Sequence, residues 1–289
     1  MNFRRPFAAM LLASLLALPA PHASAQTLEP DRRPAGIEAG SGSASAPDWF
    51  EQLGDDGRSL LGAPLRWDSR TWKRVGLACG AVAILMAADG AARERLVTGP
   101  YRTPQNALDL VGPLGQEYSW AVLAGFYGAG RVTGNERAMA VAQDGLKASL
   151  IAAGIVTPAI QALAGRARPD TDGGGRTFLS GGSSFPSGHT TQAFALAGVI
   201  ASHDARWWVD LVAYALASGV GWSRIANDAH FLSDVVAGAL IGVSVGRAVV
   251  RMNDERRITI EPFVIEDGGG VVFRMDAGSL RGLFRRGRP

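Results

Sequence analysis

The segment from Asp48 to Asn253 alternates apolar stretches with breaks marked by glycine and proline, and this pattern limits the possible fold more than any other feature. Apolar residues make up 47% and charged residues 19% of the 289 residues, which excludes a disordered or collagen-like chain. We expect an all-α bundle of about six helices. They are predicted near residues 71–90, 117–131, 136–165, 189–203, 207–222 and 230–252.

The charge-free runs are short for membrane spans, which need about 20 mostly apolar residues. Only Ala148–Gly165 reaches 18 residues without a charge, and it contains Pro158. These lengths favour a compact bundle, either soluble or resting on a membrane surface, over a polytopic membrane protein. Gly238, Gly242 and Gly246 recur every fourth residue and predict that a neighbouring helix approaches closely.

The first 25 residues have the features of a secretory signal peptide. A basic start at Arg4 and Arg5 precedes an apolar stretch, and residues 23–25 (Ala-Ser-Ala) offer a small-residue cleavage site. The alternative is an uncleaved amphipathic anchor. We expect an exported, periplasmic protein, soluble or membrane-associated, in which residues 26–47 form a flexible leader.

The helical domain is expected at 48–255, and residues 256–289 differ from it in character. Between Ile258 and Met275, two β-branched and aromatic runs flank Asp267-Gly-Gly-Gly270, which predicts a short β-hairpin. The arginine-rich end of the chain is predicted to be a solvated basic tail rather than a contact to anionic lipid.

Charge and cysteine content argue against several functional classes. The net charge of +3 and the pI of 9.4 come from scattered charges, so no nucleic-acid partner is expected. The single cysteine, Cys79, excludes an internal disulfide framework and a cysteine-based metal cluster. The sequence contains no acidic cluster with metal-ligand spacing, so we expect neither a metal nor another cofactor.

Two segments at predicted helix ends offer groups that bind anions. Pro169 stops a long helix and leaves Arg168 at its C-terminal end. Further along, Pro186-Ser187-Gly188-His189 opens a helix, so the Gly188 N–H and the Ser187 hydroxyl face a place that favours phosphate. His189 at the same corner has the chemistry to protonate a departing oxygen. The simpler alternatives are a solvated arginine and a plain N-cap serine.

A third segment combines a histidine with an acid. His230 and Asp234 are four residues apart, so on a helix they share a face and are expected to hydrogen-bond directly. A carboxylate bound to one ring nitrogen makes the other nitrogen a better nucleophile. Ser223-Arg224 precedes this pair and supplies a second guanidinium, a group that matches phosphate oxygens. A purely structural His–Asp pair is the alternative.

In their order and spacing these blocks resemble the type 2 phosphatidic acid phosphatase (PAP2) and vanadium haloperoxidase superfamily. Its motifs are Lys-x6-Arg-Pro, Pro-Ser-Gly-His and Ser-Arg-x5-His-x3-Asp. The resemblance covers about residues 136–252 and implies a PAP2-like helical bundle. It further implies that His230 forms a phosphohistidine oriented by Asp234, and that His189 is the general acid and base. The phosphoryl oxygens would be held by Arg168, Arg224, Ser187 and the Gly188 N–H.

One position departs from the family pattern, because Gln161 stands where the family has lysine. Gln161 brings no charge but can still donate a hydrogen bond, so the resemblance implies that it too binds the phosphate. Reduced activity, an altered substrate, or compensation by Arg166 are the possible consequences. The function implied is a metal-independent phosphatase acting on phosphorylated small molecules or lipids, with a membrane surface as a possible partner. The alternatives are a vanadate-dependent haloperoxidase and a weakened phospholipid-binding homologue. Substrate selection is expected from the loops at 98–115 and 171–184.

Overall fold

The computed structural model describes residues 46–99, 103–171, 177–256, 258–265 and 268–275. Its helices are α2 (Ala46–Leu61), α3 (Ser69–Leu96), α4 (Gln105–Val111), α5 (Glu117–Thr133), α6 (Glu136–Ile151), α7 (Thr157–Ala164), α8 (Gly188–His203), α9 (Trp207–Ala226) and α10 (Leu232–Arg256). Short segments are the 3₁₀ turns η1 (Ala63–Arg66) and η2 (Gly112–Gly115) and the π-helical η3 (Ala152–Val156). The expected helical architecture is confirmed, and α2 and α4 are additional helices.

The long helix expected at 136–165 is continuous in direction but changes its winding. Its α6 and α7 parts are joined by the π-helical η3, and Pro158 lies in the first turn of α7. Proline has no N–H for the preceding turn, so a wider turn accommodates it without ending the helix. The helix then ends at Gly165, which adopts a left-handed conformation with φ 52°.

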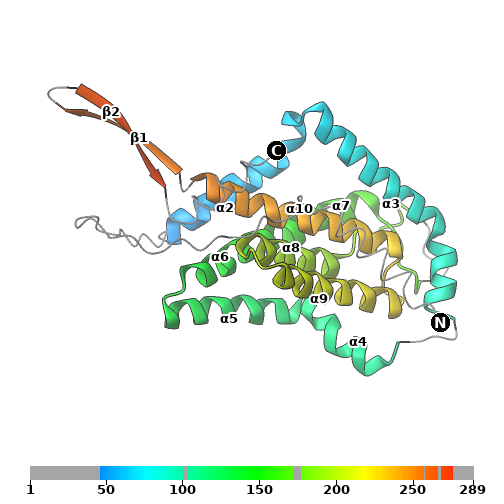
Figure 1. The fold of residues 1–289 in the computed structure, drawn as a ribbon. Helices are drawn as coiled ribbons and strands as arrows, with labels where there is room; N and C mark the ends of the chain where they lie inside the picture. Colours follow the sequence, from blue (N-terminus) through cyan, green and yellow to red (C-terminus); the bar gives the residue numbers. More distant parts are fainter. Residues whose placement is uncertain (1–45, 100–102, 172–176, 257, 266–267, 276–289) are drawn as a thin grey trace.

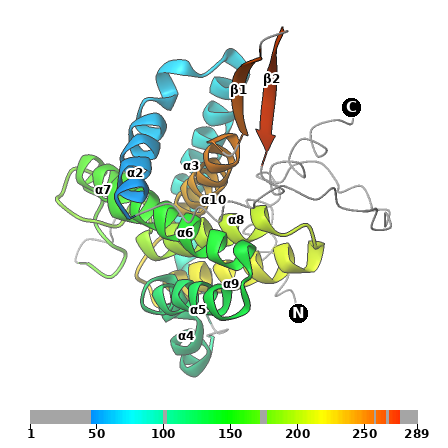
Figure 2. The same ribbon diagram turned by 90° about the vertical axis from the view of Figure 1, so that its left-hand side faces the viewer.

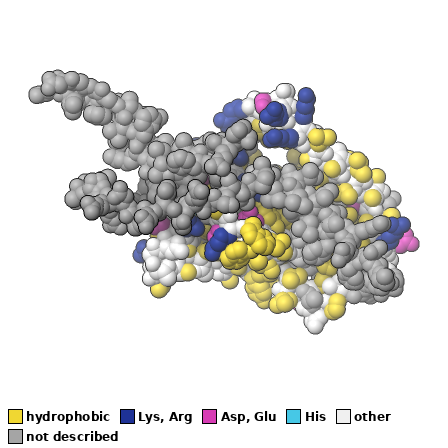
Figure 3. Space-filling view, in the orientation of Figure 1, with side chains coloured by type: hydrophobic (Ala, Val, Ile, Leu, Met, Phe, Trp, Pro, Cys, Tyr) yellow, Lys and Arg dark blue, Asp and Glu magenta, His cyan; other side chains and the backbone are white. Residues whose placement is uncertain are grey.

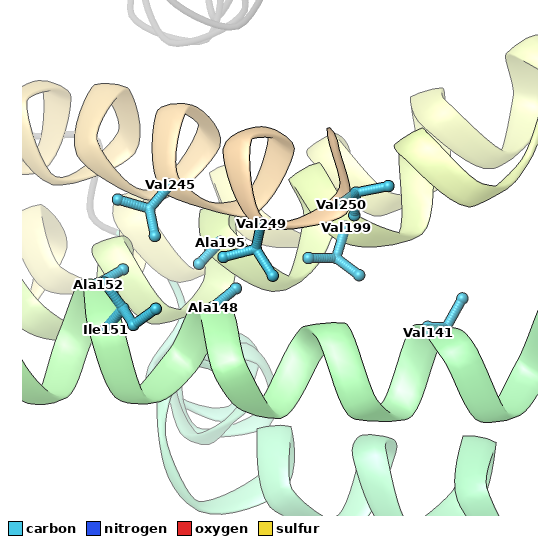
Figure 4. Packing of buried hydrophobic residues seen from close by; sticks show 9 residues of the cluster. All are labelled: Val141, Ala148, Ile151, Ala152, Ala195, Val199, Val245, Val249 and Val250. Carbon is cyan, nitrogen blue, oxygen red and sulfur yellow. The ribbon is translucent and has the colours of Figure 1, made fainter. Parts of the chain in front are cut away.

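Helices α8 and α10 form the centre of the bundle, with α6 against both (Figures 1 and 2). Figure 4 shows Ala195 and Val199 of α8 between Val245 and Val249 of α10 and the α6 side chains below them. A second cluster on the other side of α8 includes Phe194 and the α9 residue Tyr214.

The glycines of α10 explain how closely α8 and α10 approach each other. A Cβ atom at Gly238, Gly242 or Gly246 would overlap the backbone carbonyl oxygens of Ser187, Thr191 and Ala195, respectively. The helix approach that this spacing predicts is therefore present. Because Gly238 lies against Ser187, the same contact fixes the start of α8 relative to α10.

Within the part of the chain that the structure describes, three helical segments are long and apolar enough to cross a membrane: Ser69–Leu96, Glu136–Ala164 and Leu232–Asp254. Each contains an 18-residue window with no more than two charged residues. The length of a charge-free run therefore underestimates the length of an apolar helix, because the helices continue past isolated charges. The argument that these helices are too short to span a membrane no longer holds. Figure 3 shows hydrophobic side chains along α3, and Leu77 and Ile84 are 76% and 72% exposed.

Four predictions lie wholly or partly outside the described residues. The signal peptide and residues 26–45 of the leader are not described, whereas residues 46 and 47 of the predicted leader belong to α2. Beyond α10, strands β1 (Ile258–Ile265) and β2 (Gly268–Met275) are paired antiparallel. The turn that would join them includes residues 266–267, which are not described, so the hairpin stays a prediction, as does the basic tail.

Candidate active site

His230 lies in the loop between α9 and α10 and not on a helix. α9 ends at Ala226, α10 begins at Leu232, and Asp228 between them adopts a positive φ of 56°. The His230 side chain is buried, and its Nδ1 is 2.8 Å from the carbonyl oxygen of Ser184. A carbonyl only accepts, so Nδ1 carries the hydrogen and the lone pair of the neutral ring is on Nε2.

The direct hydrogen bond expected between His230 and Asp234 is absent. The Asp234 Oδ2 atom is 3.7 Å from Nδ1, because His230 precedes the helix and the helical i, i+4 geometry does not apply. Oδ2 instead accepts from the Ser184 hydroxyl at 2.6 Å and from the Phe231 N–H at 2.9 Å. Asp234 is therefore connected to His230 indirectly, because the Ser184 hydroxyl binds Asp234 and the Ser184 carbonyl binds His230.

Ser184 is a site residue that the sequence motifs do not contain. It is fully buried, and its N–H donates to the carbonyl of Arg166 at 2.9 Å. Its contribution to His230 is made by a backbone carbonyl, which any residue has. The type of residue at position 184 therefore does not predict this contact.

The start of α8 is fixed from three sides. The Ser187 N–H donates to the backbone carbonyl of Asp234 at 3.0 Å, and the Ser187 hydroxyl accepts from Thr190 Oγ1 at 3.0 Å. The Ser187 side chain makes no capping bond to a helix N–H, so the plain N-cap alternative is not observed. One residue earlier, the Pro186 carbonyl accepts from Gln161 Nε2 at 2.9 Å. Gln161 thus holds the turn that leads into Gly188 and His189.

The expected compensation by Arg166 for the missing family lysine is not observed, because Arg166 is bound elsewhere. Its guanidinium is 1% exposed and is bound to the carboxylates of Asp89 and Asp234. Lys147 is also committed elsewhere, because its Nζ is 2.8 Å from Gln52 Oε1. Neither cation is free to replace the lysine.

Electrostatic coupling places His189 near three other candidate residues. Burial is the main cause that lowers the pKa of His189 to about 4, and Arg224, His230 and Arg168 lower it further. Glu117, at the start of α5, acts in the opposite direction. Salt screens such charges less in a partly buried site than at the surface, where their range is about 10 Å at 0.1 M ionic strength. The structure thus brings together residues from α8, α9 and the two loops.

Arg224 and Arg168 differ in their surroundings. Burial lowers the pKa of Arg224, with Glu117 opposing and Arg168 adding to this effect. The turn η2 packs against this region, because a Cβ on Gly112 would lie 3.0 Å from Arg224 Nη2. Arg168 is exposed beyond the end of α7. The Arg224 guanidinium is therefore packed against η2, and Arg168 is exposed to solvent.

The arrangement suits metal-free binding of an oxyanion. Two arginines, the start of a helix and two histidines lie at one end of the bundle, with the lone pair of His230 on Nε2. Among the described residues, no three His, Cys, Asp or Glu side chains are grouped so that they would hold a metal ion.

Comparison with known proteins gives relatives for part of the chain. It is 40% identical over 84 residues to a lipid A 1-phosphatase from Porphyromonas gingivalis, covering 28% of this chain and 17% of that protein. It is 30% identical over 135 residues to lipid phosphate phosphatase 2 from Arabidopsis thaliana, covering 35% and 47%. The chain thus spans less than half the length of these curated relatives.

Two solved structures are also similar. The crystal structure of LpxE from Aquifex aeolicus matches with a TM-score of 0.41 and 20% identity, covering 58% of this chain and 93% of that chain. A transmembrane PAP2-type phosphatidylglycerolphosphate phosphatase from Bacillus subtilis matches with a TM-score of 0.38 and 19% identity, covering 72% and 94%. Residues 145–258, which include all three motif blocks, match the family model of the PAP2 superfamily.

Proposed function

We propose that this chain is an exported, membrane-associated phosphatase that hydrolyses lipid phosphates through a phosphohistidine. The observation that carries the proposal is the state of His230. Its Nδ1–H is committed to the Ser184 carbonyl, which leaves Nε2 as a nucleophile at the end of the bundle where His189 and two arginines gather. The curated relatives are phosphatases of lipid A and of lipid phosphates, which supports this substrate class.

The first half of the proposed reaction transfers the phosphoryl group. The Nε2 lone pair of His230 attacks phosphorus, and the bond between phosphorus and the ester oxygen breaks. His189 takes up the proton that a monoanionic substrate brings and passes it to the leaving alkoxide. Arg168, Arg224, the Ser187 hydroxyl and the Gly188 N–H would stabilise the negative charge of the transferring group. The positive charge on the phosphorylated imidazole lies close to the buried carboxylate of Asp234.

The second half releases phosphate. His189, now neutral, takes a proton from water, and the resulting hydroxide attacks phosphorus and breaks the bond to Nε2. His230 returns to its neutral form with the proton on Nδ1, and one water is consumed per ester hydrolysed. Asp234 and Ser184 keep the ring in place through both halves.

A phosphate-release panel in detergent tests this proposal. Phosphatidate, isoprenoid diphosphate and lipid A are compared with water-soluble sugar phosphates and nucleotides. We expect EDTA-resistant release that is fastest with lipids and is inhibited by vanadate, which binds phosphate sites. Release that requires a metal, or binding of lipid phosphate without turnover, contradicts the proposal. The second result would identify the weakened phospholipid-binding homologue, and peroxide-dependent halide oxidation would identify a haloperoxidase.

Membrane insertion of α3 can be tested with the single cysteine of the chain. Cys79 is exposed and lies near the middle of the apolar part of α3. If α3 spans the bilayer, a membrane-impermeant maleimide should label Cys79 at least about tenfold more slowly in proteoliposomes than after denaturation, because thiolate formation requires water. A Leu65→Cys, Cys79→Ala variant gives the control for accessibility, because Leu65 is 92% exposed and lies outside α3. Rapid labelling of Cys79 in intact vesicles excludes a span.

Gln161 offers a test of the departure from the family pattern. Gln161→Lys adds a positive charge and retains a donor for the Pro186 carbonyl, so we expect kcat/KM equal to or higher than that of the wild type. Gln161→Ala removes the donor and should lower kcat/KM by about fivefold, since one hydrogen bond is worth about 1 kcal/mol. A severe loss in Gln161→Lys would show that the glutamine has a role that needs an uncharged amide.

A further inference from the structure

A buried polar chain connects α3 to the His230 ring. Asp89 of α3 accepts from the Nη2 atom of Arg166 at 2.8 Å, and Arg166 Nη1 donates to Asp234 Oδ1 at 2.5 Å. The other oxygen of Asp234 accepts from the Ser184 hydroxyl at 2.6 Å, and the Ser184 carbonyl accepts from His230 Nδ1 at 2.8 Å. Residues from four segments are thus connected one after another from α3 to the ring, and the last connection is the backbone carbonyl of Ser184.

Because these side chains are buried, each of their polar atoms lowers the stability of the fold unless a hydrogen bond or an ion pair replaces its contact with water. Asp89 and Arg166 are each 1% exposed, and Asp234 is fully buried. Ser233 pairs both oxygens of Asp89, because its hydroxyl donates to one at 2.5 Å and its N–H donates to the other at 3.0 Å. Within this network the Arg166 Nε–H has no hydrogen-bond partner in the described structure. The Arg166 guanidinium also lies 4.2 Å from the centre of the Phe231 ring. Buried ions with several directional partners have few alternative arrangements.

We propose that Asp89 and Arg166 are positioning residues for His230. They hold Asp234, which holds Ser184, which fixes the Nδ1–H form of the ring. Two carboxylates and one guanidinium also leave a net negative charge behind the ring, where it stabilises the positive charge that the ring gains on attack. This inference rests on the proposed role of His230 as the nucleophile. Asp89 lies outside residues 145–258 and so outside the matched PAP2 segment.

The Arg93–Asp228 ion pair provides a matched control. Arg93 Nε and Nη2 bind the two Asp228 oxygens at 2.7 and 2.5 Å, so this pair also joins α3 to the loop between α9 and α10. Its side chains are 33% and 23% exposed, and no hydrogen bond in the described structure joins it to Asp89, Arg166 or Asp234. A variant of Asp228 therefore tests docking of α3 without altering the buried chain.

The kinetic test compares Asp89→Asn with Asp228→Asn. In the Asp89→Asn variant the remaining side-chain oxygen can still accept from Ser233, but the amide nitrogen cannot accept from Arg166. We expect kcat to fall by about 100-fold with KM within about threefold, the size of loss that small misplacement of a reacting group causes. Asp228→Asn keeps the shape and the left-handed preference of the residue and should change kcat by less than about threefold. Equal losses in both variants overturn the inference in favour of simple docking.

A spectroscopic readout separates this inference from the proposed function. The chain has only four histidines, so ¹⁵N spectra of histidine-labelled protein can resolve the ring of His230. Wild type should show the single Nδ1–H form at His230, and Asp89→Asn should show a mixture of both forms. An unchanged ring signal in Asp89→Asn overturns the inference. An inactive wild type with the expected ring signals contradicts the proposed function alone.

Three further variants guard against loss of folding and test the role of charge. Ser233→Ala removes only the neutral hydroxyl between Asp89 and Arg166, and should lower kcat by about threefold to tenfold. Arg166→Lys retains the positive charge and should keep more activity than Arg166→Gln. If Ser233→Ala has wild-type kcat, or if the lysine and glutamine variants are equally impaired with intact folds, the positioning role is wrong.

Discussion

Replacing His230 by alanine should lower kcat for phosphate release by about 10⁴-fold or more, since removal of a nucleophile costs losses of this order or larger. The variant should also fail to form an acid-labile, ³²P-labelled protein in a rapid-quench experiment. Binding should persist, because Arg168, Arg224 and the start of α8 are unchanged. The measurement is single-turnover phosphate release together with detection of the labelled protein.

His203 provides the control for this substitution. It lies at the other end of α8, and its Nε2 is 2.8 Å from Asp144 Oδ2. Fourteen residues of helix separate it from His189, about 21 Å at 1.5 Å per residue. His203→Gln keeps a donor for Asp144 and should leave kcat within about threefold of the wild type. Release by His230→Ala at the wild-type rate would show that another group forms the intermediate, or that none is formed.

Replacing His189 by asparagine should separate the two halves of the reaction. With an alkyl phosphate the leaving oxygen needs a proton, so we expect kcat to fall by about 10²- to 10⁴-fold, the usual contribution of general acid catalysis. With 4-nitrophenyl phosphate the leaving group departs unaided. We then expect a burst of about one nitrophenolate per protein, followed by slow turnover, because water is no longer activated and the phosphohistidine accumulates.

The pH dependence of kcat/KM in the wild type gives a second test of the proposed role of His189 in proton transfer. Burial, with Arg224 next in size, lowers the pKa of His189 to about 4, so its ring is neutral in the free protein above that pH. The proton for the leaving group must then arrive with a monoanionic substrate, whose second ionisation is near pH 6. We expect kcat/KM for an alkyl phosphate to fall about tenfold per pH unit above about 6. A profile that stays flat to about pH 8, or His189→Asn without a burst, contradicts this role.

The helical part of the fold could be predicted because its signal is local. Apolar periodicity and the positions of glycine and proline were sufficient for the six expected helices, and the spacing of Gly238, Gly242 and Gly246 indicated a close helix contact. Helix α2 was missed because it follows a segment rich in Pro, Gly and Ser, and it contains glycines itself. The length argument against membrane spans failed because the length of a helix differs from the length of its charge-free core.

The candidate site shows where local signals end. The three motif blocks named His189, His230, Arg168 and Arg224, and the structure couples these four electrostatically. The i, i+4 spacing of His230 and Asp234 predicted a direct hydrogen bond that the structure lacks, because a spacing rule assumes a helix that starts two residues too early. Arg166 looked available for phosphate because nothing in its neighbours reveals the two carboxylates that bind it.

The amino-acid sequence by itself determined the helices and the identity of the groups that meet at the end of the bundle, because helix periodicity and side-chain chemistry are properties of short segments. Only the tertiary structure decided which atoms face one another. The Ser184 carbonyl that sets the His230 ring, and the link from Asp89 through Arg166 to Asp234, join residues 46 to 77 positions apart. Such contacts depend on how the helices pack around α8 and α10, and no short segment of the chain contains that information.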